Sequence, residues 1–312
     1  MENLKKLRYV YMGSPAMSAE FLTHLINENF NIIAVISNPA RKVGRKQTVE
    51  HTDVSKVAQA HNIPLFTPIN IKNDYEFFLH LDVDVILTFA YGQIVPLEVL
   101  NHAKIIALNY HGSILPKYRG ASPIQHALIN GDKLTGVSLM RMVEKMDAGE
   151  VYGVKMFPIF PEDNYATLSN KTVFAAKCVT NEVLKDVVTL KNKGVPQDET
   201  KVTFTKLLKK DDFKLSINDP LVNFLGKIRA FSPEPGAVYT YNNLHLKILK
   251  AAFYKEKHVA PIGELFVVER EGLFLQHSVG VIKLLTVQKP GKNALDGLSY
   301  THGERTLRKI NL

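Results

Sequence analysis

The segment from Leu108 to Gly149 contains three polar residues whose types can do chemistry together. Asn109 and His111 follow a buried strand pattern, and Asp147 begins a turn sequence, Asp-Ala-Gly. A carboxamide or an imidazolium can donate to an oxygen that becomes negative during a reaction, and a carboxylate can accept a proton. Each residue alone is more often structural, because Asp is common in turns and a His at a strand end is usually a hydrogen-bonding residue. If the three meet at one sheet edge, they form a candidate catalytic centre.

An alternating pattern in the first half of the chain predicts the elements that would position these residues. Short apolar runs alternate with segments that have apolar residues at helical spacing. This pattern favours a mainly parallel sheet covered by helices on both faces, with ligands beyond the carboxyl ends of the strands. The predicted strands are residues 7–12, 31–37, 83–89 and 105–110, a further strand follows from residues 135–138, and the predicted helices are residues 18–27, 54–60 and 166–191.

The pattern changes after the long helix. Gly194 and Pro196 are stop signals, and residues 192–207 are interpreted as a linker. A helical pattern is then followed by closely spaced strand patterns, which suggest a small β-barrel of the oligonucleotide-binding (OB) type. The helix is predicted at residues 220–230 and the strands at 236–241, 244–254, 263–268, 272–277 and 281–288. We therefore expect a Rossmann-like α/β domain over residues 1–191 and a smaller OB-like barrel domain over residues 208–312.

The composition is typical of a folded globular protein with a polyanionic partner. Hydrophobic residues make up 46% and charged residues 22% of the 312 residues, and the formal net charge is +9. Residues 209–312 hold 16 Lys and Arg against 10 Asp and Glu, so the last third carries most of the excess. A single cysteine, Cys178, cannot form an intramolecular disulfide, and neither a signal peptide nor a membrane span is recognisable. We expect a cytoplasmic protein, monomeric because no coiled-coil pattern is present.

The sequence lacks the motifs of several common classes of enzyme and nucleotide-binding protein. The sequence has no Gly-x-Gly-x-x-Gly dinucleotide fingerprint, no phosphate-binding loop ending in Gly-Lys-Ser/Thr, no Gly-x-Ser-x-Gly elbow and no His-Glu-x-x-His. The histidines outside the candidate centre, such as His51, His61, His102 and His126, have no metal-ligand spacing, so no metal is expected. Cys178 falls within the long helical pattern and is interpreted as a packed hydrophobe.

The run Asn-Tyr-His-Gly-Ser-Ile-Leu-Pro at residues 109–116, together with Asp-Ala-Gly at 147–149, resembles the formyltransferase family that uses 10-formyltetrahydrofolate. The resemblance is closest to the members that formylate methionine on initiator tRNA. It extends over essentially the whole chain, through the segments 12–15, 90–96, 119–125, 229–233 and 289–292.

The resemblance implies an activity and its residues. The implied reaction moves the formyl group of 10-formyltetrahydrofolate to the amino group of methionine on charged initiator tRNA, for use in translation initiation. Asn109, His111 and Asp147 are then the catalytic residues. The implied folate-binding residues are Phe89, Ala90, Tyr91, Gly92, Ile94, Ser113, Ile114, Leu115 and Pro116.

The tRNA contacts implied by the resemblance lie in a basic loop after the second strand and in the last third of the chain. The loop supplies Arg41, Lys42, Arg45 and Lys46, although it departs from the family pattern at Ala40 and residues 46–51. Broader candidates are Lys206, Lys209, Lys210, Lys247 and Lys250. Three alternatives remain open: formyl transfer to a small amine such as an amino-sugar nucleotide, hydrolysis of formyl-folate, and an RNA-binding protein without activity.

Overall fold

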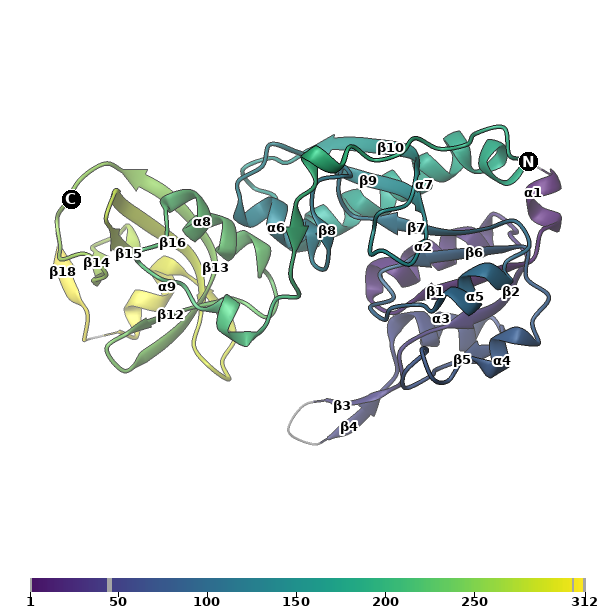
Figure 1. The fold of residues 1–312 in the computed structure, drawn as a ribbon. Coiled ribbons are helices and arrows are strands. Elements are labelled where there is room, and N and C mark those ends of the chain that lie inside the picture. The colour runs from purple at the N-terminus through teal and green to yellow at the C-terminus, as the bar shows by residue number, and fades with distance from the viewer. Residues whose placement is uncertain (1, 44–46, 305, 311–312) are drawn as a thin grey trace. The chain divides into compact units, whose positions relative to one another are not determined.

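The structure, a computed structural model, describes residues 2–43, 47–304 and 306–310 (Figure 1). The described chain forms two compact units. The first comprises residues 1–123, 134–158 and 169–205, and the second comprises residues 124–133, 159–168 and 206–312. The second unit thus takes two short segments from within the predicted first domain.

The first unit is built on a seven-stranded sheet with the order β10-β9-β7-β6-β1-β2-β5. The central neighbours, from β7 to β5, pair in parallel, whereas β9 and β10 run antiparallel. The strands of this sheet are β1 Tyr9–Gly13, β2 Ile32–Ile36, β5 Leu65–Phe66, β6 Val85–Phe89, β7 Ile106–His111, β9 Leu134–Arg141 and β10 Val151–Pro158. Two small two-stranded sheets accompany it, β3 Arg41–Val43 with β4 Thr48–Glu50, and β8 Arg119–Gly120 with β11 Phe204–Thr205.

The central strands β1 and β6 are buried on both faces, which explains their continuous apolar sequences. Successive side chains of β1 point to opposite faces, so Tyr9 and Tyr11 pack in one core cluster while Val10 and Met12 pack in another. Residues of α2, α3 and α7 belong to the first cluster and residues of α4 and α5 to the second. The helices are α1 Glu2–Lys6, α2 Ala16–Asn27, α3 Asp53–Ala60, α4 Glu76–Leu79, α5 Leu97–His102 and α7 Tyr165–Val188, of which the first residues of α7 group with the second unit.

The second unit contains a mainly antiparallel sheet with the order β12-β13-β16-β15-β14-β18, in which β17 also pairs with β16. Its core is a cluster of buried side chains that includes Phe224 of α8 and Leu246, Leu273 and Ile282 of the sheet. The elements are α6 Pro123–Ile129, the short helix η2 Lys210–Phe213, α8 Leu221–Ala230, β12 Ala237–Tyr241, β13 Leu244–Lys255, β14 Leu265–Val268, β15 Gly272–His277, β16 Gly280–Gln288, β17 Ala294–Asp296, α9 Gly297–His302 and β18 Arg308–Ile310. The predicted fold class, a mainly parallel α/β domain followed by a smaller β domain, is confirmed.

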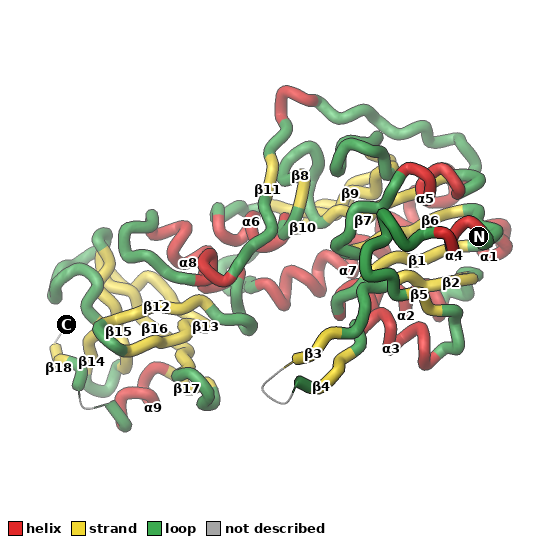
Figure 2. The backbone as a smooth tube through the Cα atoms, turned by 60° about the horizontal axis from the view of Figure 1, so that its bottom comes forward, coloured by secondary structure: helices red, strands yellow, loops and turns green. Residues whose placement is uncertain are grey.

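The segment interpreted as a linker is bound along most of its length to the first unit. Val195 exchanges backbone hydrogen bonds with Val151, and a short helix, η1, covers Glu199–Lys201. Strand β11 then runs parallel beside β8, as both ribbon and tube views show (Figures 1 and 2). Residues 195–205 are called the strap below, because their backbone and side chains contact the turns that carry the candidate catalytic residues.

Candidate active site

Asn109 and His111 are placed by the end of β7, next to β6 on one side and β9 on the other. In the register of these strands Asn109 lies opposite Thr88, and His111 lies opposite Ser138. Residues two apart on a strand point to the same face, so both candidate side chains project from one face of the sheet. Asn109 is half-buried and His111 is only 5% exposed.

The imidazole of His111 is held at both ring nitrogens. Its Nε2 atom lies 2.7 Å from the backbone oxygen of Tyr118. A carbonyl oxygen can only accept, so Nε2 carries a hydrogen and donates it. The Nδ1 atom faces Asp147, with 3.5 Å between Nδ1 and Oδ2. Direct donation from Nε2 to a substrate oxygen therefore requires the bond to Tyr118 to be exchanged.

Asp147 sits in the turn between β9 and β10, and its backbone has an unusual conformation. Its φ angle is +50°, in the left-handed region that costs free energy for most residues. Its side chain is 14% exposed, and its Oδ2 atom accepts a hydrogen bond of 2.8 Å from the backbone N–H of Gly120. The structure thus brings His111 and Asp147 together and places Asn109 two residues from His111 on the same strand.

Four residues around this pair have roles that sequence reasoning missed. Tyr118 and Gly120 contribute backbone groups, and Gln197 donates from Nε2 to the backbone oxygens of Asp147 and Gly149, at 2.8 Å each. Arg119 is fully buried and donates from Nε to Gln197. Arg119 and Gly120 belong to the segment 119–125, one of those that carry the family resemblance. Gln197 lies in the predicted linker, where no sequence pattern indicated a role in the site.

The expected folate residues 89–94 follow the carboxyl end of β6. The side chains of Phe89 and Tyr91 are buried in the two core clusters, so these residues can reach a ligand mainly through their backbone. Ala90 and Gly92 adopt positive φ angles, and the Ile94 side chain is 54% exposed. Two buried hydroxyls, Thr88 Oγ1 near the end of the strand and Tyr91 OH in a core cluster, have no hydrogen-bond partner among the described residues.

A polar network that the sequence did not reveal fixes this loop. The side-chain amide of Asn38 donates to the Tyr91 backbone oxygen at 2.7 Å and to Ser14 Oγ at 2.9 Å. The amide of Gln93 in turn donates to the Asn38 side-chain oxygen at 2.7 Å. These bonds tie together the ends of β1, β2 and β6, where ligands bind in open parallel sheets.

The second expected folate segment, Ser113 to Pro116, follows β7 and is fixed by one hydroxyl. The Oγ atom of Ser138 accepts from the Leu115 N–H at 3.0 Å and donates to the Ser113 backbone oxygen at 2.7 Å. Ser113 and Leu115 are buried, whereas Ile114 and Pro116 are half-buried. Both expected folate segments therefore border the strand end that carries Asn109 and His111.

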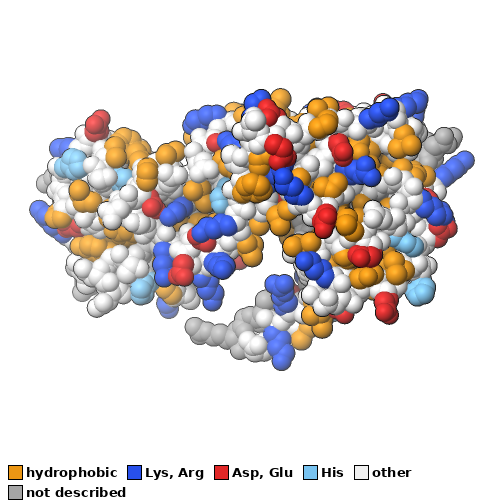
Figure 3. All heavy atoms as spheres, viewed as in Figure 1, with side chains coloured by type: hydrophobic (Ala, Val, Ile, Leu, Met, Phe, Trp, Pro, Cys, Tyr) orange, Lys and Arg blue, Asp and Glu red, His pale blue; other side chains and the backbone are white. Residues whose placement is uncertain are grey.

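The expected tRNA contacts are spread over both units. Arg41 and Lys42 are exposed on β3 of the β3–β4 hairpin, and Figure 3 shows Lys and Arg side chains on the surface of this hairpin. Arg45 and Lys46 lie outside the described residues. In the second unit the ammonium of Lys206 pairs with Asp212 at 2.7 Å. The remaining candidates, Lys209, Lys210, Lys247 and Lys250, are exposed or half-buried in the second unit.

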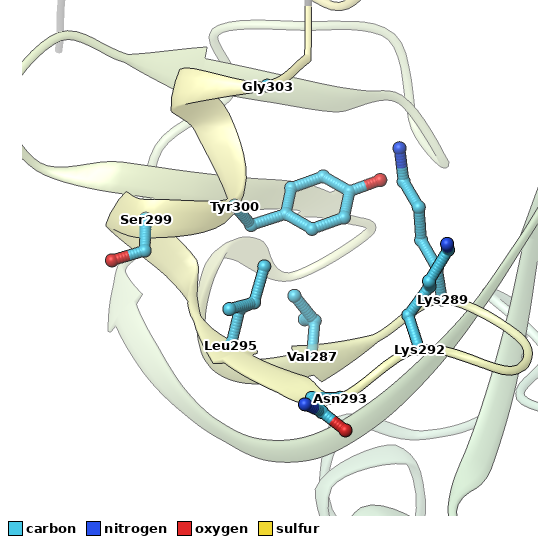
Figure 4. Close-up of a pocket in the computed structure, with 8 residues that line it drawn as sticks. All are labelled: Val287, Lys289, Lys292, Asn293, Leu295, Ser299, Tyr300 and Gly303. Atoms are coloured by element: carbon cyan, nitrogen blue, oxygen red, sulfur yellow. The ribbon is translucent and has the colours of Figure 1, made fainter.

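The second unit also contains a small pocket of about 260 Å³ (Figure 4). Tyr300 is buried at its wall, and the ammonium of Lys289 lies 5.0 Å from the Tyr300 ring centre and 3.1 Å from a Glu304 oxygen. The other lining residues are Val287, Lys292, Asn293, Leu295, Ser299 and Gly303. The pocket contains none of the residues expected to act in catalysis.

Two expectations concern features away from the centre. Cys178 is a half-buried free cysteine on α7. In the part of the chain that the structure describes, no group of three or more His, Cys, Asp or Glu is arranged to hold a metal ion, and no helix is long and apolar enough to cross a membrane. The expected absence of a metal stays a prediction.

Comparison with known protein families gives two matches that together span most of the chain. Residues 5–184 match a family model described as formyl transferase, and residues 207–305 match the formyl transferase C-terminal domain. A methionyl-tRNA formyltransferase of Mesoplasma florum is 35% identical over 298 residues, 95% of each chain. One of Lactobacillus acidophilus is 36% identical over 299 residues, again 95% of each chain.

Solved structures share the fold at lower sequence identity. The methionyl-tRNA formyltransferase from Clostridium thermocellum aligns with a TM-score of 0.58 and 17% identity, over 80% of this chain and 95% of that chain. WlaRD, a sugar 3N-formyl transferase, aligns with a TM-score of 0.66 and 20% identity, over 92% of this chain and 99% of that chain. HypX from Aquifex aeolicus in complex with tetrahydrofolic acid aligns with a TM-score of 0.64 and 16% identity, over 98% of this chain and 49% of that chain.

Proposed function

This chain belongs to the formyl transferase family, and on that premise we propose that it moves a formyl group from 10-formyltetrahydrofolate to the amino group of methionine on initiator tRNA. One observation carries the proposal: the similarity to methionyl-tRNA formyltransferases runs through both units at about 35% identity. The product is formylmethionyl-tRNA, the substrate of translation initiation. We place the enzyme in the cytoplasm and propose that it acts as a monomer.

The proposed donor site is the end of β6 and β7. The segments 89–94 and 113–116 border it, and the orphaned hydroxyl of Thr88, which lies opposite Asn109 in the strand register, is a group that a polar ligand or water can satisfy there. Gly92 has a positive φ angle and no side chain, so the backbone there can approach a ligand closely. The donor supplies an activated formyl group, and its nitrogen leaves when the new amide forms.

Asp147 is proposed as the proton acceptor for the attacking amine. The methionine amino group is an ammonium at neutral pH and must lose a proton before its lone pair can attack the formyl carbon. One oxygen of Asp147 is engaged by Gly120 and faces His111, so we assign its other oxygen to this proton, directly or through water. A second proton leaves the nitrogen as the amide forms and is returned to the departing folate nitrogen. Asp147 then releases the first proton to solvent, so one proton is set free per turnover.

Asn109 is proposed as the group that stabilises the negative oxygen of the tetrahedral intermediate. Asn109 is half-buried, and a preorganised N–H donor in such a site stabilises developing charge without reorganisation. In its protonated form His111 donates through Nε2 to Tyr118 and faces Asp147 through Nδ1. Such an imidazolium would act on the intermediate from two residues further along the same strand.

We propose tRNA as the acceptor because the hairpin and the second unit carry basic residues. A small-amine acceptor is the second candidate, since the fold is shared with the sugar formyl transferase WlaRD. That protein is 20% identical to this chain, whereas the methionyl-tRNA formyltransferases reach 35 and 36%. The exposed Arg41 and Lys42 and the excess of Lys and Arg after residue 208 also suit a phosphate backbone.

The test is formylation by the purified protein. With 10-formyltetrahydrofolate and charged initiator Met-tRNA, the wild-type protein is expected to form formylmethionyl-tRNA in a single turnover, and an Asp147→Asn variant is expected to be strongly impaired. Release of formate without transfer, by the wild-type protein, would support the hydrolase alternative instead.

A further inference from the structure

The left-handed turn at Asp147 needs support from outside itself. With a φ angle of +50°, this residue occupies a conformation that is uncommon for residues other than glycine, and such conformations persist where the surrounding structure enforces them. Gly149, which ends the turn, is packed so closely that a Cβ atom there would overlap the Arg141 backbone oxygen. The geometry of the Asp147 carboxylate therefore depends on the groups that hold this turn.

Gln197 of the strap holds the turn from one side. Its Nε2 group donates to the Asp147 and the Gly149 backbone oxygens, at 2.8 Å each. A primary amide has two N–H donors, so these two bonds use both of them. The carbonyl oxygen of the same side chain accepts from Arg119 Nε at 3.0 Å, which fixes the orientation of the amide.

Arg119 connects Gln197 to the other contacts of the catalytic pair. The residue before it, Tyr118, accepts the hydrogen bond of His111, and the residue after it, Gly120, donates to Asp147. The contacts thus form a closed ring that runs from His111 through Tyr118, Arg119, Gln197 and Asp147 back to His111. A displacement of the Arg119 side chain is therefore transmitted to both catalytic residues.

The charge of Arg119 is balanced within the strap. Its side chain has no exposed area, and a buried guanidinium requires a charged or hydrogen-bonding partner. It donates to Glu199 at 2.6 Å, and Glu199 also pairs with Lys145 at 3.0 Å. The hydrogen bond from Arg119, followed by that from Lys145, lowers the pKa of Glu199, which keeps this carboxylate charged.

The strap itself is fixed by backbone pairing at both ends. Val195 exchanges two hydrogen bonds with Val151 next to the Asp147 turn. Thr203 accepts from the Arg119 N–H at 2.8 Å through its backbone and from the Tyr118 N–H at 2.9 Å through its hydroxyl. Phe204 then pairs with Arg119 in the β8–β11 ladder. Gln197 is therefore presented from a rigid support.

We infer that Gln197 and Arg119 are positioning residues for formyl transfer, which set the Asp147 carboxylate against His111 through the backbone of the Asp147 turn. The inference rests on the proposed function, because it presumes that Asp147 receives the proton of the attacking amine. It assigns the strap, a segment between the two family-model matches, to the catalytic centre.

The test compares two substitutions of Gln197 with the substitution of a glutamine on the surface of α3. Gln197→Ala removes the amide, and Gln197→Glu keeps the size and the acceptor for Arg119 but replaces the donor to the two backbone oxygens. Gln59→Ala is the control, since Gln59 is an exposed glutamine of α3 that lies outside the strap and outside both turns. Arg119 is left intact, because truncating a fully buried arginine risks unfolding.

We expect both Gln197 variants to lose about 10- to 100-fold in kcat while the KM for donor and tRNA changes by less than about twofold, since a small misplacement of a reacting group has effects of this size. In Gln197→Glu the acid limb of the kcat profile should move to higher pH, because a second carboxylate beside Asp147 favours proton uptake there. Gln59→Ala should retain wild-type values.

The outcomes separate this inference from the function on which it rests. Wild-type kcat and pH profile in both Gln197 variants, together with an inactive Asp147→Asn variant, would overturn the positioning role and leave the proposed function intact. If the Asp147→Asn variant transferred the formyl group at the wild-type rate, the proposed mechanism would be wrong, and with it the premise of this inference. A loss in the Gln197 variants that is matched by a lower unfolding temperature, with no change in the pH profile, would assign Gln197 to stability alone and also overturn the inference.

Discussion

The Nδ1 atom of His111 lies 3.5 Å from the Oδ2 atom of Asp147, although the two residues are 36 positions apart in the chain. Two hydrogen bonds with the Tyr118–Gly120 segment fix this pair: His111 Nε2 donates to the Tyr118 carbonyl, and the Gly120 N–H donates to Asp147 Oδ2. Because the Tyr118 carbonyl fixes a hydrogen on Nε2, the proton of a charged imidazole is added at Nδ1, toward the carboxylate. The pair thus places a buried imidazole against a carboxylate near the end of β7.

Replacing Asp147 by Asn tests its role as proton acceptor at nearly constant shape. We expect the single-turnover rate of formyl transfer to fall by about 10²- to 10⁴-fold, which is the usual contribution of a positioned acid or base. The affinity for tRNA should stay close to that of the wild type, because the residues proposed to bind phosphate are elsewhere. Quench-flow measurement at saturating substrates, with a parallel tRNA-binding titration, checks both parts. Transfer at an undiminished rate would exclude Asp147 as the acceptor.

The hairpin is expected to contribute electrostatically to tRNA binding. Neutralising Arg41 and Lys42 together should weaken binding and lower the slope of log affinity against log salt by about one unit for each tRNA phosphate that the protein no longer neutralises. The matched control neutralises Lys72 and Lys191, two exposed lysines of the first unit outside the hairpin. Filter binding over a salt series measures both slopes. Equal slopes in the two double variants would remove β3 from the tRNA surface.

The Ser138 hydroxyl is expected to fix the backbone of the proposed folate-binding segment 113–116, which follows β7. In Ser138→Ala the Leu115 N–H and the Ser113 carbonyl lose their partner, at a cost of about 1–3 kcal/mol. The KM for the formyl donor should rise by up to about tenfold, whereas the affinity for tRNA should not change. Ser169→Ala is the control, since it removes a buried hydroxyl that has no partner among the described residues. If both variants had the same donor KM, the segment at 113–116 would not be part of the donor site.

The ion pair of Arg8 and Asp84 should make stability depend on pH. The hydrogen bond from the Arg8 side chain lowers the pKa of Asp84 in the folded protein. This stabilisation is present above the ordinary carboxyl pKa of about 4 and is lost as the pH falls through the lower folded value. Asp84→Asn should therefore lower the free energy of unfolding at pH 7 by about 1–3 kcal/mol and have a smaller effect near pH 3.

Urea unfolding at the two pH values measures this difference. Asp82→Asn is the control, because Asp82 also pairs with Arg8 but is far more exposed. It should have the smaller effect at pH 7, as exposed ion pairs contribute little. A penalty for Asp84→Asn that is equal at both pH values would show that its charge does not stabilise the fold.

Local pattern predicted the elements that carry the candidate site. The apolar runs at residues 83–89 and 105–110 became β6 and β7, and the motif that follows β7 lies where parallel sheets bind ligands. Each of these strands is buried on both faces, so its signal is a short continuous apolar run that does not depend on partners far along the chain. The five strands predicted after residue 235 are likewise present, with small shifts at their ends.

Sequence patterns could not predict which segments far apart in the chain would pair. The strap has no strong periodicity, and its role depends on Gln197 meeting a turn 50 residues earlier. Strand β18 pairs in parallel with β14 across about 40 residues, and the second unit takes α6 from the middle of the first domain. Such pairings are decided by tertiary packing, which local propensity does not encode.

The central claim is tested most directly by the choice of acceptor. We would measure kcat/KM for formyl transfer from 10-formyltetrahydrofolate to charged initiator Met-tRNA, to charged elongator Met-tRNA and to an amino-sugar nucleotide, with one preparation of the enzyme. We expect rapid transfer to initiator Met-tRNA, slower transfer to the elongator form and none to the sugar nucleotide. Formylation of the sugar nucleotide with the tRNA left unmodified would contradict the assignment of tRNA as acceptor, while leaving formyl transfer itself in place.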